Sequence, residues 1–327
     1  MNNINNINNI NNINNINNIN NMNKKFEEDA RIYEYTSAAN PNMPIIPVMT
    51  YLADSYQSGE TRIIYFDNKE SLDTSYKATS PNLLASFIRI CKGEKIGVKS
   101  MGTSNVFYVI RGSGNTVFEK DTIHWKTGDL FVVPYSNYDI VLEASEEDSI
   151  LYWINDEPLL YYLGAKPLLQ KFRPTYFAKD RMLLEIDEIR NNNDWTMLNR
   201  LGILLGNRLT EDTTKTLTHT MWSLLNVLPA KSMQKPHRHN SVALDLCISS
   251  ECSEFEGVYT LMGEEIDEEG NIVNPVRCDW ITGSVFITPP GWWHSHHNDS
   301  SVDAYVLPVQ DAGLYTYQRT LDIRFFS

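Results

Sequence analysis

The chain has 327 residues and a formal net charge of −13, and its Lys and Arg residues are scattered with no basic block. Nucleic acids and anionic membranes attract positively charged surfaces, so this charge argues against both as partners. No apolar run has the length of a membrane span, and the N-terminus lacks a basic segment followed by an apolar one. We therefore expect a cytoplasmic protein with no nucleic acid and no membrane among its partners.

The N-terminal residues 1–23 repeat the triplet Asn-Asn-Ile. A period of three matches neither the strand period of two nor the helix period of 3.6, so the Ile side chains would not gather on one face. This pattern predicts a disordered tail. Self-association through ladders of Asn side chains is the alternative that the composition permits.

Short apolar or alternating segments, punctuated by Gly residues, make up most of the remaining chain. In chain order, the expected strands include 84–91, 106–111, 115–119, 129–134, 140–142, 221–228, 242–248, 258–261, 284–288 and 304–309. Strands at this spacing are typical of a sandwich or a small barrel. The series occurs twice, on either side of a segment with helical patterns. The sequence therefore predicts an all-β chain with a barrel at 24–155, a linker with short helices at 156–200, and a second barrel at 201–327.

The four cysteines lie apart and form no CxxC pair. Cys247 lies in an apolar run and is expected to be a small core residue. The spacing of Cys252 and Cys278 would allow a disulfide, but nothing in the sequence requires one. Scattered cysteines of this kind are more typical of a reducing compartment.

Five of the seven histidines lie in two short stretches of the second half, PHRH at 236–239 and WWHSHH at 292–297. His237 and His239 are two residues apart, so on a strand both imidazoles project from the same face. One further histidine from a distant strand would complete a facial three-nitrogen metal site with open positions for substrate and oxygen. A doublet alone is more often exposed or hydrogen-bonded, so the interpretation depends on the second stretch.

The second stretch resembles the second sequence motif of the cupin superfamily. That motif runs Gly, five residues, Pro, one residue, Gly, two residues, His, three residues, Asn, and every fixed position is present in 283–298. Gly291 permits a tight bend that returns His294 to the interior. The resemblance implies the double-stranded β-helix, or jelly-roll, of a cupin, with His237, His239 and His294 as metal ligands.

The first cupin motif is altered, with Lys231 where Gly is usual and Ala243 where Glu is usual. Three histidines without that Glu resemble the ligand set of the gentisate, salicylate and 1-hydroxy-2-naphthoate 1,2-dioxygenases, which are bicupins. The sequence around the doublet resembles theirs as well, and it puts Trp222 where that family has a pocket-lining Trp. His296 matches the second His of the family's WHxH. This closer resemblance covers about residues 195–325.

Two positions bear on the substrate. Six residues after the second His, those dioxygenases have an Arg that grips the substrate carboxylate, and this chain has Asp245 there. An acidic side chain would repel a carboxylate and suit an amine, a hydroxyl or a nearby Arg. Arg200 resembles a second carboxylate-binding Arg of the family, and a surface or linker salt bridge is an equal alternative. Trp222, Asp245 and Arg200 are thus the expected substrate-binding residues.

The same motifs laid over the first half contain no histidine. Asp139 stands at the position of the terminal His, and Lys99, Met101 and Asn105 stand at the other ligand positions. A cationic Lys is a poor metal ligand. We therefore expect the first barrel to keep the scaffold without the metal site.

The resemblance implies Fe(II), or another divalent transition metal, and the cleavage of a hydroxylated aromatic acid or related aromatic by O2. His296 would carry a proton or orient a substrate oxygen. One alternative is a non-enzymatic cupin that binds or senses a small molecule, and another is a metal-dependent isomerase or decarboxylase. Related bicupins are oligomers, and the apolar run 159–163 needs a partner surface, so we expect a homo-oligomer, a dimer or a tetramer.

Overall fold

The computed structural model describes residues 24, 26–39, 41–192, 200–210, 213–249 and 257–326. Residues 44–327 form one unit, and the chain up to Met43 forms another. In the first unit the 3-10 helix η1 (Tyr35–Ala39) has no buried residue. The Asn-Asn-Ile tail and Cys252, with its expected option of pairing, lie outside the described residues.

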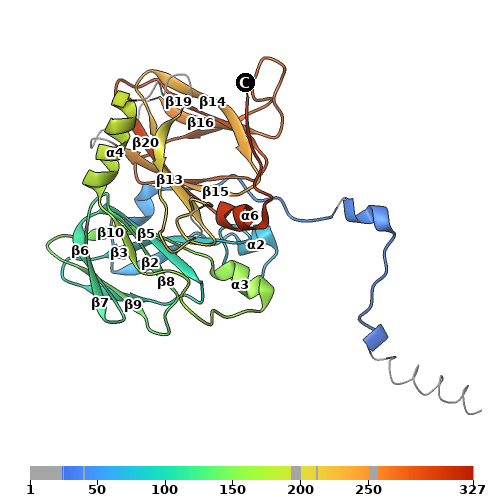
Figure 1. Cartoon of the computed structure of the whole chain (residues 1–327), viewed down its shortest axis with the longest axis horizontal. Helices are drawn as coiled ribbons and strands as arrows, with labels where there is room; N and C mark the ends of the chain where they lie inside the picture. Colours follow the sequence, from blue (N-terminus) through green and yellow to red (C-terminus); the bar gives the residue numbers. More distant parts are fainter. Residues whose placement is uncertain are drawn as a thin grey trace, which may run out of the picture. The chain divides into compact units, whose positions relative to one another are not determined.

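The first barrel consists of two antiparallel sheets (Figure 1). Its inner sheet, which faces the second barrel, has the order β11-β8-β5-β10-β3-β2, and its outer sheet has the order β4-β9-β6-β7. These strands are β2 (Arg62–Tyr65), β3 (Leu84–Ile90), β4 (Lys95–Val98), β5 (Ser104–Arg111), β6 (Ser113–Phe118), β7 (Asp121–Lys126), β8 (Leu130–Pro134), β9 (Ile140–Ala144), β10 (Ser149–Asn155) and β11 (Thr175–Phe177).

The second barrel repeats this arrangement. Its inner sheet has the order β1-β18-β15-β20-β13-β12, and its outer sheet has the order β17-β16-β19-β14-β21. These strands are β1 (Thr50–Tyr51), β12 (Leu201–Leu204), β13 (Trp222–Leu228), β14 (Ser232–His239), β15 (Ala243–Ser249), β16 (Val258–Gly263), β17 (Val276–Asp279), β18 (Val285–Thr288), β19 (Trp293–Asn298), β20 (Ala304–Gln310) and β21 (Ile323–Phe325).

Helices occupy the connections between strands. They are η2 (Ala53–Tyr56), α2 (Lys69–Leu72), α3 (Glu157–Leu163), α4 (Lys179–Asn192) and α6 (Ala312–Gln318). Helix α3 has Pro158 in its first turn and is followed by Gly164 in the left-handed conformation. Proline is favoured in the first turn of a helix, and glycine is favoured just after the last turn. Within the described residues, no helix is long and apolar enough to cross a membrane.

The segment expected as a helical linker is only partly helical. It contains α3 and α4, but the residues that follow Gly164 are irregular. Strand β11 then adds itself to the edge of the first barrel by pairing with β8, with Phe177 opposite Leu130. The three-residue length of β11 explains why its sequence shows no strand alternation.

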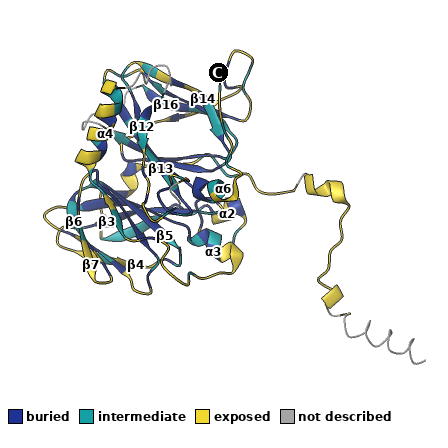
Figure 2. Cartoon of the chain, viewed as in Figure 1, coloured by how far each residue is buried: buried dark blue, intermediate teal, exposed yellow. Residues whose placement is uncertain are grey.

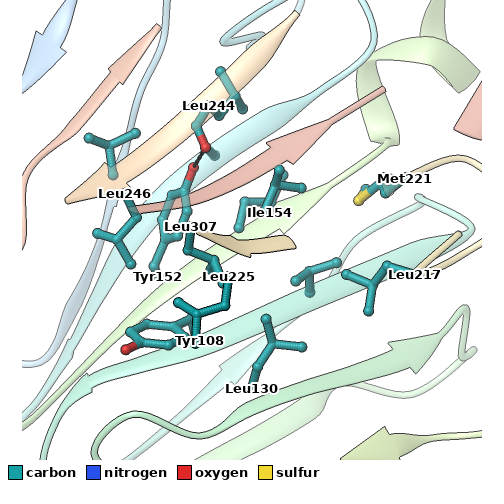
Figure 3. Packing of buried hydrophobic residues seen from close by; sticks show 14 of the residues in the cluster. Tyr108, Leu130, Tyr152, Ile154, Leu217, Met221, Leu225, Leu244, Leu246 and Leu307 are labelled. Atoms are coloured by element: carbon teal, nitrogen blue, oxygen red, sulfur yellow. Dashed lines mark hydrogen bonds between the residues drawn. The ribbon is translucent and has the colours of Figure 1, made fainter. Parts of the chain in front are cut away.

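Side chains alternate along the inner sheets between two different cores. On β15, Leu244 and Leu246 pack into a core between the barrels, whereas Cys247 belongs to the interior of the second barrel. The inter-barrel core joins residues of both inner sheets, and Figure 3 shows Leu244 and Leu307 beside Tyr152 and Ile154 of the first barrel. The Tyr152 hydroxyl donates a hydrogen bond to the Leu244 carbonyl oxygen at 3.5 Å. These inner strands are accordingly buried, while α3 and α4 turn a face to solvent (Figure 2).

One N-terminal segment crosses from the first barrel to the second. Strand β1 precedes every strand of the first barrel, yet it pairs with β18 of the second, with Thr50 opposite Phe286. Just after it, Ala53 N–H donates to the Ser284 hydroxyl at 2.9 Å, and the Tyr56 hydroxyl donates to the Gly283 carbonyl at 3.0 Å. The two barrels are therefore joined by strand pairing as well as by apolar packing.

Candidate metal centre in the second barrel

Strands β14 and β19 carry the two histidine stretches and lie side by side in the outer sheet. They pair antiparallel, with His237 opposite His294. His239 lies two residues after His237 and so reaches the same side of the strand. The turn before β19 contains Gly291 at φ +79°, a conformation that favours glycine, and its N–H donates to the His239 carbonyl at 2.7 Å. The tight bend expected from the sequence thus ties one histidine stretch to the other.

His237, His239 and His294, here called the histidine triad, each offer a ring nitrogen within 4.8 Å of the other two. The ring centroid of His294 lies 4.0 Å from that of His237 and 4.9 Å from that of His239. Within the part of the chain that the structure describes, this is the one such group of three potential metal ligands. A metal–imidazole bond is about 2 Å long, so a small contraction would let the three rings share one ion.

In two rings of the triad, hydrogen bonds at Nδ1 leave the Nε2 atom available to bind a metal. The Nδ1 atom of His239 lies 2.8 Å from the Ser241 carbonyl oxygen, and that of His294 lies 3.1 Å from the Trp292 carbonyl oxygen. A carbonyl oxygen only accepts, so each ring carries its proton on Nδ1 and its lone pair on Nε2. Metal-binding histidines commonly have this arrangement, so the two rings fit the expected role.

His237 has a different partner. Its Nδ1 lies 3.0 Å from an Arg200 guanidinium nitrogen, which can only donate, so Nδ1 accepts and Nε2 holds the proton. Metal binding through Nε2 would require that proton to move to Nδ1 and Arg200 to turn away. Arg200 also donates to the Lys235 carbonyl at 2.9 Å and lies over the Phe325 ring. Burial lowers the pKa of Arg200 to about 10, so the guanidinium keeps its charge at neutral pH.

Burial also keeps the triad uncharged. It lowers the pKa of His237 and of His294 well below the usual 6.5, and the neighbouring histidines and Arg200 add to the effect. Burial lowers the pKa of His239 as well, and the hydrogen bond that its ring donates to the Ser241 carbonyl has the opposite, smaller effect. A metal needs a neutral imidazole as its ligand, so the donor set suits a divalent transition metal without prior loss of protons.

A cavity of about 270 Å³ reaches the triad from between the two sheets of the second barrel. It is lined by Arg200, Gly202, Ile203, Leu204, Trp222, Leu224, Asn226, Gln234, His237, His239, Asp245, His294, His296, Val306, Pro308, Gln310, Ile323 and Phe325. A cavity of about 150 Å³ can hold benzene, so this one has room for a single substituted ring. The structure brings all seven site residues expected from the sequence to this one cavity.

His296 faces the same cavity, with its ring centroid 5.7 Å from that of His294, but it is not among the residues whose ring nitrogens lie within 4.8 Å of one another. Its Nδ1 lies 2.8 Å from the Thr260 hydroxyl, which in turn accepts a hydrogen bond from the Trp280 indole at 2.8 Å. This chain of contacts holds the ring in one orientation. Burial lowers the pKa of His296 to about 3, so the ring is neutral at physiological pH.

Asp245 lies on the inner sheet, across the cavity from the strands that carry the triad. The residue is 4% exposed, and its Oδ2 accepts a hydrogen bond from the Thr288 hydroxyl at 2.7 Å. Burial raises the pKa of Asp245 to about 7, against the lowering effect of that hydrogen bond. Trp222, from β13, is half-buried in the same wall.

Sequence reasoning missed two parts of the cavity wall. Gln234 lies an odd number of residues before His237, which would place it on the opposite face of a regular strand. The pairing of β14 with β19 shifts register between these two residues, and this bulge turns the Gln234 side chain into the cavity. There its amide exchanges two hydrogen bonds of 3.1 Å with Asn226. Pro236, inside the shift, was the available signal, because Pro within a strand marks bulges and edges.

The other missed part is β21, near the C-terminus. It pairs with β14 so that Phe325 lies opposite His237 and Ile323 lies opposite His239. The Phe325 ring is near-parallel to the His237 ring, with 5.8 Å between centroids. A three-residue strand carries too little alternation to be recognised from its sequence.

Among solved structures, the chain matches salicylate 1,2-dioxygenase from Pseudaminobacter salicylatoxidans with a TM-score of 0.69, at 14% sequence identity over 94% of this chain and 97% of that one. A variant of that enzyme in complex with gentisate matches with a TM-score of 0.68, at 14% identity over 94% of each chain. The fold is that of a bicupin. At this identity the likeness concerns the fold alone. No family model matches the sequence, and no curated protein is significantly similar to it.

The two barrels of this bicupin differ in their interiors. Lys99 and Asp139 of the first barrel are exposed, and Met101 is half-buried. Asn105 is buried and accepts a hydrogen bond from the Trp153 indole at 3.1 Å. These four are the residues that stand at the ligand positions of the motif in the first barrel. The core of the first barrel contains stacked aromatic rings, with Phe107 between Phe131 and Trp153.

Proposed function

We propose that the histidine triad holds one divalent transition metal, Fe(II) in the working enzyme, and that this bicupin is a dioxygenase that opens the ring of a small hydroxylated aromatic. The observation that carries the proposal is the meeting of three neutral, largely buried imidazoles in a cavity of single-ring size. A barrel interior does not need such a group in order to fold, because the first barrel is filled by apolar and aromatic side chains.

The fold adds support. Salicylate 1,2-dioxygenase has the same two-barrel arrangement, and a variant of it has been solved in complex with gentisate, a dihydroxylated benzoate. The proposed reaction breaks one carbon–carbon bond of the ring, and both atoms of O2 enter the product, so no other oxidant or reductant is needed. The bound metal would supply the electron transfer between an electron-rich ring and O2 that protein side chains cannot perform.

The side chains of the cavity would bind and orient the substrate. Trp222 and Phe325 provide aromatic surfaces against which a flat ring can lie. His296, held by Thr260, is placed to share a hydrogen bond with a substrate oxygen near the triad. The contact with Thr260 fixes the orientation of the His296 ring, which suits a role in positioning the substrate. The surface that the cavity walls present is mostly apolar, and polar contacts are stronger beside such a surface than in water.

Oxygen uptake tests the proposal. The metal-free protein would be loaded anaerobically with Fe(II), exposed to air and given a panel of hydroxylated benzoates, naphthoates and aminophenols. We expect at least one compound to consume one O2 per molecule and to yield a product heavier by two oxygen atoms, as measured with an oxygen electrode and mass spectrometry. The His294→Ala variant, treated in the same way, should show no uptake.

Other outcomes would favour the alternatives. Tight binding of a panel compound with no product would indicate a binding or sensor protein. Release of CO2 or formation of an isomer without oxygen uptake would indicate a metal-dependent decarboxylase or isomerase. Either result would contradict the dioxygenase proposal.

A further inference from the structure

The barrel fold does not explain why the cavity wall contains an acidic residue, Asp245. Strand alternation turns Leu244 and Leu246 into the inter-barrel core, and so it turns Asp245 into the interior of the second barrel. The carboxylate is almost completely buried there. Within the described residues, Thr288 supplies the one hydrogen bond that Asp245 receives, and no cationic side chain forms an ion pair with it. Burying a carboxylate with a single hydrogen bond and no ion pair lowers the stability of the fold, unless a bound ligand supplies a further partner.

The first barrel shows what the scaffold itself requires at this position. Asp245 pairs with Phe286 of β18 and with Pro308 of β20. In the first barrel the corresponding strands β5, β8 and β10 place Phe107 opposite Phe131 and Trp153. Phe107 stacks on Phe131 with 4.9 Å between ring centroids, and it lies parallel to Trp153 at 6.0 Å. An aromatic side chain therefore satisfies the fold at this position, and the acid has a different role.

The charged side chains lie on different parts of the cavity wall. Arg200 contacts His237 on the outer sheet, whereas Asp245 projects from the inner sheet next to Thr288. The cavity is also lined by apolar side chains of the inner sheet, including Leu224 and Val306. A ligand that reaches the triad with one edge would therefore present another part of its ring to Asp245.

We propose that Asp245 selects aromatic ligands that carry a ring amino or hydroxyl group, which donates a hydrogen bond to its carboxylate while another edge of the ring faces the triad. The same side chain rejects rings with a carboxylate at that position, because two anions would meet in an apolar wall. This inference rests on the proposed function, since it concerns the ligand of the same cavity. Burial raises the pKa of Asp245 to about 7, so the carboxylate that accepts this hydrogen bond is fully formed only above that pH, and the affinities are compared at about pH 8.

Binding under anaerobic conditions tests the inference without turnover. Fe(II)-loaded protein would be titrated in a calorimeter with salicylate, with each ring isomer of aminosalicylate and hydroxysalicylate, and with the matched ring-carboxylated salicylates. For the wild-type protein we expect at least one amino or hydroxyl isomer to bind roughly 10- to 100-fold more tightly than salicylate, as a hydrogen bond to a charged group allows. The carboxylated isomers should bind more weakly than salicylate.

Asp245→Asn and Asp245→Leu should remove most of this preference, measured in each variant as the ratio of the affinity for the amino or hydroxyl isomer to the affinity for salicylate. Both replace a buried acid by a neutral side chain of similar size, so folding should survive, and circular dichroism would check it. Thr288→Val, which keeps the carboxylate, should keep the preference. The matched control is Asp279→Asn, because Asp279 is an exposed acid of the same barrel that is paired with Arg277. It should leave every affinity unchanged.

The results separate this inference from the proposed function. An unchanged preference in Asp245→Asn and Asp245→Leu would overturn the inference, whether or not the enzyme consumes oxygen. Failure of the wild-type protein to bind any amino or hydroxyl isomer more tightly than salicylate would overturn it as well. A preference that depends on Asp245, found together with an absence of oxygen uptake, would support the inference and contradict the dioxygenase.

Discussion

Four imidazoles share one cavity in the second barrel, with that of His237 half-buried and the others buried, and three of the four lie close enough to share an ion. The fourth, His296, occupies the position two residues beyond His294, and its ring is turned toward Thr260. His296 is therefore distinguished from the triad by the position of its ring nitrogens and not by the distance between ring centroids. This distinction is the most direct point at which the site can be tested.

Metal analysis of single variants provides that test. We expect close to one metal per wild-type chain. His294→Ala should lower the affinity for the metal by far more than the roughly 10- to 100-fold that is typical of changes outside the ligand set. His296→Ala should keep most of its metal and lose turnover, because it removes a positioning group only.

His297→Ala is the control for these variants. His297 stacks on Tyr259 with 4.7 Å between centroids and lies outside the cavity lining. It should keep both metal and turnover. Full metal occupancy in His294→Ala combined with an empty site in His296→Ala or His297→Ala would show that the ligands have been assigned to the wrong residues. Two metals per chain would contradict the restriction of the site to the second barrel.

Asp245 also makes a prediction about stability and pH. Its pKa in the folded protein is raised from 3.8 to about 7, so the folded state binds its proton more tightly than the unfolded state does. The resulting stability is present at low pH and is lost as the pH rises through about 7. The Asp245→Asn variant has no such titrating group. Its unfolding free energy should therefore exceed that of the wild type by an amount that increases between about pH 4 and pH 7. The pH-dependent part of this gain should level off at roughly 4 kcal/mol, because one pKa unit corresponds to about 1.4 kcal/mol.

Urea unfolding of the metal-free proteins at several pH values measures that difference. The buried histidines have the opposite dependence, because their pKa values are lowered in the folded state and their unfolded forms take up protons below about pH 6.5. This contribution is common to both proteins and cancels in the comparison. A gain that shrinks as the pH rises would contradict the assignment of a raised pKa to Asp245.

At the scale of elements, two irregular features of the outer sheet complete the site. The bulge in β14 brings Gln234 into the wall, and the short strand β21 covers the ligand-bearing end of β14. The backbone of β21 runs along both His237 and His239, so it restrains their positions. Its side chains Ile323 and Phe325 also close one side of the cavity.

Removing residues 323–327 should therefore weaken metal binding by roughly 10-fold, in the range expected when the supports of metal ligands are lost. Binding of a panel aromatic should weaken as well, because an apolar wall is missing. Phe325→Ala is the matched variant, since it keeps the strand backbone and removes only the ring. It should keep the metal affinity and lose affinity for the aromatic. Equal metal affinity in the truncated and full-length proteins would show that β21 does not support the ligands.

At the scale of the whole molecule, the two barrels share a continuous core. Leu307 is fully buried in it, among residues of both inner sheets (Figure 3). Because β1 also crosses to the second barrel, we expect the barrels to unfold together in one transition. Leu307→Ala should lower the unfolding free energy by about 2–5 kcal/mol without splitting that transition. Calorimetry and near-ultraviolet circular dichroism would check it, and two separate transitions in the wild-type protein would contradict the shared core.

Assembly is the remaining prediction at this scale. The end of α3 exposes Tyr161, Tyr162 and Leu163, and Tyr162 is 78% exposed. We expect this surface to bury itself against another copy of the chain, which should then be a dimer or tetramer in size-exclusion chromatography with light scattering. Tyr162→Glu should shift the protein toward the monomer. Tyr138→Glu, at an exposed aromatic of the first barrel, should not. A monomeric wild-type protein would refute the assembly and leave the fold untouched.

The sequence by itself determined the features that depend on local spacing. The distance between His237 and His239 predicts a shared strand face, and the Gly and Pro positions around His294 predict the turn that returns it to the interior. The doubled series of short strands predicts two barrels. The tertiary structure alone decided which segments complete them. The pairing of β1 with the second barrel and of β21 with β14 depends on contacts between residues distant in sequence. Strands this short show no alternation of apolar and polar residues from which they could be predicted. Gln234 enters the cavity only because a bulge breaks the alternation on which its prediction would rest.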